Sequence, residues 1–394
     1  MSQTGLKWKL MILCIFLLDV VAFGADAIAQ KVIFETDMES DIDDAGALAM
    51  LHAMADNGEC EIIAVMHNTS DPYGPGVIDA INTWYYRPDI PIGKYPIDDA
   101  YSVTFGGESR YTEAVSKDST FPKDIFTRDD VPDAVEVYKQ MLPDQPDSSI
   151  IIISVGWQMN LRRLHEDSLG RVLIEKKVKQ LVIMGGRWNP SGKPHMNLAG
   201  RSNEVPVAAK AGEYVVNKWP TPVLYLGIGA IPGFAGSDLE QEPYENPVRR
   251  CYEYAIEHSR FNLNWEHHTA DQSTILLALR GVGEYWTLID EGIPTMYWDG
   301  SAWMTKWDSS PDSHHTAVTK VSDKAKLAEA TDIIEALMVQ APKQPVMVRF
   351  DHIEPVSHTP VRFNSGMFQF FSSSEDRWYD LQGKLRIKPV REFP

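Results

Sequence analysis

The sequence predicts an α/β protein with an open, mostly parallel central sheet and helices on both faces. Short and nearly continuous apolar runs, typical of buried strands, alternate with longer stretches of helical periodicity. Strands that are apolar throughout belong to parallel sheets covered on both faces, and residues 150–153 are four consecutive isoleucines. The chain has 394 residues, 44% of them hydrophobic, which is enough for one large domain or two smaller ones.

The first part of the chain alternates strands and helices. The apolar runs predict strands over residues 31–34, 61–66 and 91–93, and helical spacing predicts helices over 43–57 and 77–85. Residues 96–130 are polar, contain glycine and have weak periodicity. We expect them to form a long insertion or loop over the sheet, a common place for substrate contacts.

The alternation then resumes and ends in a different pattern. Further strands are predicted over 149–155, 178–184 and 222–226, and further helices over 133–141, 159–167, 205–217, 246–258, 271–280 and 323–340. Short alternating runs such as Met367-Phe368-Gln369-Phe370 follow. We therefore expect one large domain over residues 30–341 and a small β-rich C-terminal extension over 342–394.

The first 29 residues have the layout of a secretory signal peptide. Lys7 and Lys9 precede a run over residues 10–21 that is apolar apart from Asp19, and a small-x-small cleavage site ends at Ala29. A membrane anchor is the alternative, but the apolar run is short for a span of about 20 residues. We expect a secreted or periplasmic protein that has no membrane association once the signal is removed.

Charge and cysteine content exclude several classes of partner. The net charge of −18 should repel nucleic acid and anionic membrane surfaces, so a small neutral or cationic ligand or a metal ion fits better. After the signal only Cys60 and Cys251 remain, which is too few for a cysteine zinc site. The two could pair in a secreted protein, but packing residues are the default interpretation.

Six carboxylates lie within ten residues, between the first predicted strand and the first predicted helix. They are Glu35, Asp37, Glu39, Asp41, Asp43 and Asp44. Helix capping by Ser40, Asp41 or Asp43 would account for two or three of them. Six would repel one another strongly unless a cation neutralises some. This position at the carboxyl end of a strand is where open parallel sheets bind ligands, and oxygen donors favour Ca²⁺ or Mg²⁺.

Two other acidic motifs fit poorly. In an EF-hand that begins at Asp37, position six would be Ile42 instead of glycine and position twelve Leu48 instead of glutamate. A phosphatase-type Asp-x-Asp motif would have Glu39 in place of its second aspartate, and no glycine-rich phosphate loop follows.

Several segments, in order, resemble the inosine–uridine-type nucleoside hydrolases. Thr36-Asp37 and Asp43-Asp44 match the family's Asp-x-Asp-x-x-x-Asp-Asp motif, with two extra residues in the loop. Three later segments are similar to the family's Gly-Asn, Gly-Pro-Leu-Thr-Asn and Met-Gly-Gly elements: His67-Asn68, residues 154–161 and Met184-Gly185-Gly186. Asp271, with Ala278 in the following helix, resembles the His-Asp element. The matches cover about residues 31–340.

The resemblance implies Ca²⁺-dependent hydrolysis of the N-glycosidic bond of a ribonucleoside. Asp37, Asp44, Asp271 and the backbone carbonyl of Met159 would bind Ca²⁺, and Asp37 would also be the general base. The ion would hold the ribose 2′- and 3′-hydroxyls and would carry and acidify the attacking water. The sugar would contact Asp43, Asn68, Asn160 and Asn197, with Asn203 and Glu204 as alternatives to Asn197.

The part of the site that faces the leaving base departs from the family. Ala270 stands where the family often has a histidine before the last metal-binding aspartate. His267 and His268 could substitute for it, or could be ordinary surface histidines. Trp157, Trp188 and Trp265 could stack on a nucleobase or could be packing residues; they belong to or neighbour the matched segments.

Two other functions stay open. One is hydrolysis of a different ribosyl or sugar conjugate by the same metal chemistry. The other is a periplasmic ribonucleoside- or sugar-binding protein that has lost turnover, which Ala270 favours and the retained Asp37 disfavours. The resemblance also implies a homo-oligomer, a dimer or tetramer.

Overall fold

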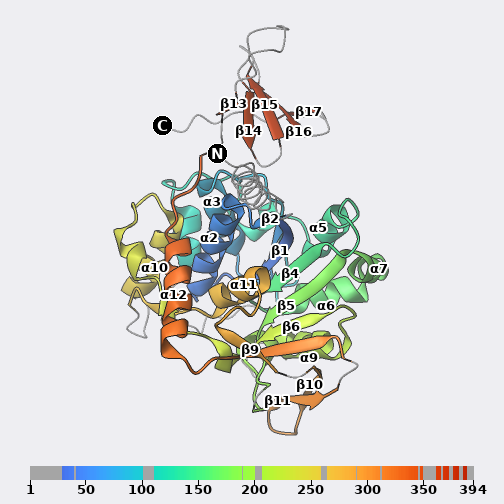
Figure 1. Cartoon of the computed structure of the whole chain (residues 1–394). Helices are drawn as coiled ribbons and strands as arrows, with labels where there is room; N and C mark the ends of the chain where they lie inside the picture. Colours follow the sequence, from blue (N-terminus) through green and yellow to red (C-terminus); the bar gives the residue numbers. More distant parts are fainter. Residues whose placement is uncertain are drawn as a thin grey trace, which may run out of the picture.

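An eight-stranded sheet forms the centre of the protein (Figure 1). The computed structural model describes residues 29–344, except 40, 101–110, 189, 200–205, 259–263, 290 and 311–312. Beyond residue 344 it describes five short strands. In order across the sheet the strands are β3 (Ile92–Lys94), β2 (Cys60–His67), β1 (Gln30–Thr36), β4 (Ile150–Ser154), β5 (Val178–Met184), β6 (Val223–Leu226), β12 (His315–Lys320) and β9 (Trp286–Leu288). Neighbouring strands are parallel except β9, which pairs antiparallel with β12 at the edge.

Helices cover both faces of this sheet (Figure 1). One face packs against α2 (Asp43–Asp56), α3 (Gly74–Trp84), α10 (Pro247–His258), α11 (Ala270–Arg280) and α12 (Lys324–Met338). The other packs against α5 (Ala134–Met141), α6 (Met159–Glu166), α7 (Ser168–Lys177) and α9 (Pro206–Lys218). Side chains alternate along each strand, so Val32 and Phe34 enter the first core while Ile33 enters the second. Two apolar cores explain the unbroken apolar strands, and the predicted fold class is confirmed.

Some elements were not predicted. The stretch 96–130 was expected to be a loop, but it contains α4 (Tyr111–Lys117), which buries Tyr111 and Val115. Helix α7 follows α6 directly, and the hairpin β10 (Gly292–Trp298) and β11 (Trp303–Ser309) precedes β12. Polar and apolar residues alternate irregularly in these segments, so local periodicity carries little signal.

The C-terminal extension forms a separate antiparallel sheet, as its alternating runs predicted. Its strands are β13 (Met347–Val348), β14 (Val361–Asn364), β15 (Met367–Phe371), β16 (Asp376–Asp380) and β17 (Leu385–Ile387). The predicted signal peptide falls almost wholly on residues 1–28, outside the described residues. Among the helices that the structure describes, none has both the length and the apolar character to span a membrane.

Cys60 and Cys251 are packing residues, as predicted. Cys60 begins β2 and Cys251 lies in α10; both are buried, and both thiols are free.

His52 should make the stability of the fold depend on pH. It is fully buried in α2, stacks on Tyr85 at 4.7 Å and bonds Asn82 Oδ1 through Nε2 at 2.8 Å. Burial, together with the nearby Arg87, lowers its pKa from 6.5 to about 3. Below pH 6.5 the His52 side chain is therefore protonated in the unfolded chain but stays neutral in the folded one. The free energy of unfolding falls as pH falls from 6.5 toward 3.

We expect His52→Phe to remove this part of the acid sensitivity. Relative to the variant, the wild type should lose up to about 1.4 kcal/mol of unfolding free energy per pH unit below 6.5. Urea unfolding across this range measures the difference. His258→Phe, at an exposed histidine, is the control; parallel pH curves for wild type and His52→Phe would contradict the prediction.

Candidate metal centre

A pocket opens where the carboxyl ends of β1, β4 and β5 meet the N-termini of α2 and α11. Five aspartates line it: Asp37, Asp41, Asp43 and Asp44 come from the acidic cluster after β1, and Asp271 comes from the start of α11. His195, Asn197, His268 and Ala270 also line it. The chain therefore brings residues more than 200 positions apart to the edge of the sheet where parallel folds bind ligands.

Three of these carboxylates lie close enough together to bind one metal ion. Asp43 and Asp44 lie in the first turn of α2, Asp271 lies in the first turn of α11, and one oxygen from each lies within 4.8 Å of the others. All three side chains are buried. The positive ends of two helix dipoles favour acids here, but α2 has Ile42 as its N-cap and no side-chain capping bond, so capping does not explain the cluster.

The electrostatics of the group call for a cation. Burial and then the charges of neighbouring aspartates raise the pKa of Asp44 and Asp271 well above the usual range. The same two causes raise the pKa of Asp37. A buried all-oxygen donor set of this kind suits a hard divalent cation, because the cation replaces repulsion by attraction. The residues present therefore fit Ca²⁺.

The lengthened loop after β1 is held from several sides. The Thr36 hydroxyl donates to Asp44 Oδ1, His67 Nε2 lies 3.0 Å from the carbonyl oxygen of Met38, and Tyr111 of α4 donates to the carbonyl of Asp41 at 2.8 Å. A Cβ on Gly156 would lie 2.5 Å from Asp37 N, so only glycine lets the β4 loop pack this closely. The two extra residues are thus accommodated by specific partners.

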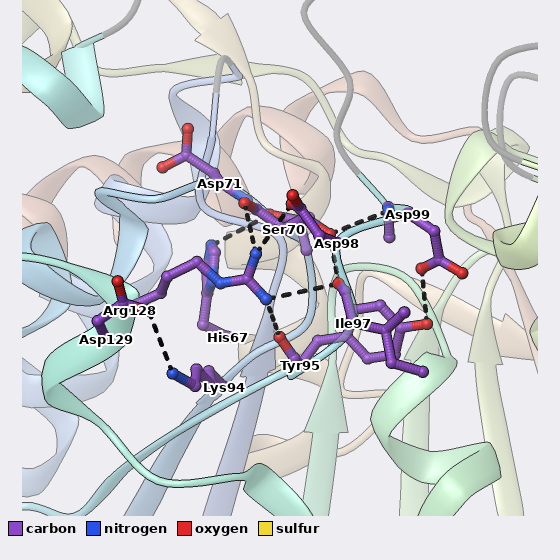
Figure 2. A network of polar contacts seen from close by, with 12 residues as sticks. His67, Ser70, Asp71, Lys94, Tyr95, Ile97, Asp98, Asp99, Arg128 and Asp129 are labelled. Carbon is purple, nitrogen blue, oxygen red and sulfur yellow. Dashed lines mark hydrogen bonds and ion pairs between the residues drawn. The ribbon is translucent and has the colours of Figure 1, made fainter.

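Arg128 ties together the loops that follow β2 and β3 on the same edge of the sheet (Figure 2). Its guanidinium donates to the carbonyls of Ser70 at 3.2 Å and Tyr95 at 2.7 Å, and to Asp98 Oδ1 at 3.2 Å. Backbone carbonyls in loops need such partners when they are partly buried. The network fixes the loop that follows His67, the last residue of β2, and the His67 ring in turn contacts the Met38 carbonyl of the acidic loop.

Glu35 is the centre of a second buried network. Oε2 accepts from Asn68 Nδ2 at 3.2 Å and Asn160 Nδ2 at 3.1 Å, and Oε1 accepts from the Tyr138 hydroxyl at 2.9 Å. The side chain is fully buried, and burial raises its pKa to about 8 against the effect of these bonds. Glu35 therefore holds both asparagines in place behind the acidic loop.

Two adjacent histidines face the acidic cluster from β8 (His267–His268), which pairs with β7 (Phe234–Ala235). His267 Nε2 bonds Asp41 Oδ1 at 2.8 Å, and His268 Nδ1 lies 3.5 Å from Asp43 Oδ2. Burial raises the pKa of Asp41, but the bond to His267 and the charges of both histidines outweigh it and bring the pKa to about 2. Burial lowers the pKa of His268, but Asp43 and Asp41 outweigh it and raise the pKa to about 9.

The predicted site residues divide into two groups. Asp37, Asp43, Asp44, Asn197, His268 and Asp271 line the pocket, and His267 lies behind it on Asp41. Asn68, Asn160, Met159 and Trp188 are not among the lining residues. Both asparagine amides are engaged by Glu35, and the roles predicted for these four residues stay predictions. Asn203 and Glu204 lie outside the described residues.

The tryptophans and Met159 pack in cores. Trp188 lies 4.6 Å from the Tyr225 ring and 5.6 Å from the Trp307 ring, and Trp157 packs with Met159 in a small buried cluster. Trp265 packs against the core on the α2 side of the sheet. Their placement matches the packing alternative.

Two residues of the site were missed. His195 lines the pocket two residues before Asn197, and burial, then the charge of His268, lowers its pKa to about 4. The sequence predicts no ligand or substrate contact for Glu35, and its role as a buried acceptor was not predicted. A histidine beside a matched asparagine was the only local signal for the first, and the three donors on Glu35 come from distant parts of the chain.

Two substitutions of Glu35 should show whether the stability of the protein depends on its hydrogen bonds or on its negative charge. Glu35→Ala removes the acceptor of three buried donors and should destabilise the protein by about 3 kcal/mol or more. Glu35→Gln keeps one acceptor for both asparagines and can donate to Tyr138, so it should cost much less. Urea unfolding of the chelator-treated protein measures both; equal losses would contradict this network.

Known structures share this fold. A plant nucleoside hydrolase matches with a TM-score of 0.53 and 18% identity, over 79% of this chain and 99% of its own. An inosine–guanosine nucleoside hydrolase matches with a TM-score of 0.55 and 18% identity, over 77% and 98%. The type III effector protein XopQ, solved in complex with adenosine diphosphate ribose, matches with a TM-score of 0.54 and 14% identity, over 80% and 95%.

Sequence comparisons add nothing to these matches. No protein-family profile matches the chain, and no curated protein sequence matches it. The resemblance seen in the sequence is confirmed at the level of architecture: the chain has the nucleoside hydrolase fold.

Proposed function

We propose that the protein is a Ca²⁺-dependent hydrolase of the N-glycosidic bond of ribonucleosides, releasing ribose and the free base. The observation that carries the proposal is the buried group of Asp43, Asp44 and Asp271, at the carboxyl edge of a sheet with the nucleoside hydrolase fold. An oxygen-only donor set supports Ca²⁺ or Mg²⁺ over zinc at this position.

Asp44, Asp271 and Asp37 would hold the ion, and Asp43 is close enough to join them. When bound, Ca²⁺ would supply a positive charge that orients the sugar diol and favours ionisation of water. The chain's own contribution is rigidity: Thr36 fixes Asp44, and the packing of Gly156 against Asp37 fixes the loop. Such preorganisation is what positions reacting groups.

Asp37 is the proposed general base. It is on the pocket wall, and it is partly exposed there while its neighbours Met38 and Glu39 are buried. Taking a proton from water as the C–N bond breaks would stabilise an oxocarbenium-like transition state at the anomeric carbon. Asp43 and Asn197, both on the wall, are the proposed sugar contacts.

His268 is the proposed proton donor to the leaving base. Ala270 lines the pocket and has no proton to give, whereas the His268 imidazole lies on the same wall beside Asp43. His195 is on the wall too and could share the role. The Asp43 carboxylate, 3.5 Å from His268 Nδ1, favours the protonated imidazole, the form that can donate a proton in general acid catalysis.

A second candidate is hydrolysis of a larger ribosyl conjugate. XopQ has the same fold and was solved in complex with adenosine diphosphate ribose. Among the described residues that line the pocket there is no tryptophan that would select a free nucleobase by stacking. A ribose-binding protein without turnover remains the third alternative.

We also propose that residues 1–29 are removed on export, which gives a secreted or periplasmic mature chain with no membrane association. Assembly into a homo-oligomer stays a prediction from the resemblance. Intact-mass measurement of the exported protein tests the first proposal, because cleavage after Ala29 leaves Gln30 as the first residue.

Ribose release from a substrate panel tests the function. The mature chain is incubated with Ca²⁺ and inosine, uridine, adenosine or adenosine diphosphate ribose, and reducing sugar is measured. Asp37→Asn should lower kcat by roughly 10²–10⁴, the usual cost of losing a general base. Asp144→Asn, at an exposed aspartate far from the pocket, is the matched control and should keep full activity.

The other results of this experiment decide between the candidates. Release from the diphosphate conjugate alone supports the second function. Tight nucleoside binding with no release by wild type or variant supports a binding protein and overturns the proposed hydrolase.

Removing the metal should destabilise the protein. Without a cation, the buried carboxylates of Asp44 and Asp271 repel each other, so chelation should lower the melting temperature and Ca²⁺ should restore it. Asp271→Asn should remove most of this Ca²⁺ response, because it deletes a charged ligand. An identical melting temperature with chelator and with Ca²⁺ would contradict the metal site.

A further inference from the structure

Asp41, His267 and His268 form a second group of metal-ligating side chains beside the carboxylate cluster. One carboxylate oxygen and one nitrogen from each imidazole lie within 4.8 Å of one another. His267 is almost fully buried, His268 is about one third exposed, and Asp41 and His268 both line the pocket. The proposed Ca²⁺ chemistry uses neither Asp41 nor His267. It uses His268 as a proton donor, so with a second ion on His268 the proton to the leaving base would come from His195, which also lines the pocket.

We propose that these three residues bind a second metal ion, a borderline divalent cation such as Zn²⁺, next to the Ca²⁺ site. Two imidazole nitrogens and one carboxylate are donors that zinc and similar transition metals prefer, and that Ca²⁺ does not. Three protein ligands leave a fourth position free, and two of the three line the pocket, so that position faces the ligand space.

The spacing of the three residues suits such an ion. Ligand atoms about 2.0–2.2 Å from a tetrahedral zinc ion lie roughly 3.3 Å apart. His267 Nε2 and Asp41 Oδ1 are 2.8 Å apart, so they need to separate by only about 0.5 Å. His268 Nδ1 has no hydrogen-bond partner among the described residues and lies 3.5 Å from Asp43 Oδ2.

The charge of the pocket also favours a second cation. Five aspartates line it, and one divalent ion on the carboxylate cluster would leave three negative charges in a largely buried space. The two imidazoles offset this only when they carry protons. Asp43 lies between the groups, within reach of Asp44 and Asp271 on one side and of His268 on the other. Asp43 would therefore lie between the Ca²⁺ site and the second metal site, next to both.

Cobalt binding tests the proposal without relying on turnover. The mature chain is stripped with chelator, saturated with Ca²⁺ and titrated with Co²⁺, a spectroscopic substitute for Zn²⁺. We expect one cobalt ion per chain and a visible absorption band from nitrogen ligation, with Zn²⁺ displacing it. His267→Ala and His268→Ala should each weaken cobalt binding by roughly 100-fold or more, since even indirect ligand support is worth 10–100-fold.

Controls separate this site from the Ca²⁺ site and from misfolding. His258→Ala, at an exposed histidine, should bind cobalt like wild type, and Asp271→Asn should lose the thermal response to Ca²⁺ but keep the cobalt band. If His267→Ala does not fold, the cobalt titration of His268→Ala tests the site alone. The His268 side chain is 34% exposed, so its removal should disturb the fold less.

The outcomes distinguish the two proposals. Ca²⁺-dependent ribose release with no cobalt band, or with a band that both histidine variants keep, would overturn the second site and leave the proposed function standing. A histidine-dependent band in a protein that releases no ribose would support the second site and count against the hydrolase.

Discussion

Repulsion among buried carboxylates is the constraint on which the arrangement of this protein depends. Asp43, Asp44 and Asp271 are held within 4.8 Å of one another at the ends of two helices, and burial makes their mutual repulsion costly. Only a scaffold with other large sources of stability can hold such a group. The two apolar cores, one on each face of the sheet, are that source.

The support for the site is layered. Thr36, His67, Tyr111 and Gly156 hold the acidic loop, and each comes from a different element. Behind them, Glu35 orients two asparagines, and Arg128 closes the neighbouring loops (Figure 2). Outer interactions of this kind orient the side chains of a site, so the proposed metal chemistry would depend on residues that never touch the ion.

Much of the fold could be predicted from the sequence, because strands buried on both faces of a parallel sheet are nearly continuous apolar runs. Strand β5 has the predicted bounds, residues 178–184, and the acidic cluster lies at the predicted edge of the sheet. Residues whose role comes only from distant partners could not be predicted. Asp41 and His267 are 226 positions apart, and Glu35 meets Tyr138 across 103. Strand β12 was missed because its residues are mixed in polarity and the strand is defined by its pairing with β6.

The hydrogen bond from Tyr111 to the Asp41 backbone joins the acidic loop to a segment that lies 70 residues further along the chain. Helix α4 belongs to the insertion after β3, yet it fixes the spacing of the acidic loop. The segment after β3 and the acidic loop are therefore coupled through this bond. A chimera that replaces residues 96–130 needs a donor equivalent to Tyr111, because without it the acidic loop loses one of the bonds that hold its backbone in place.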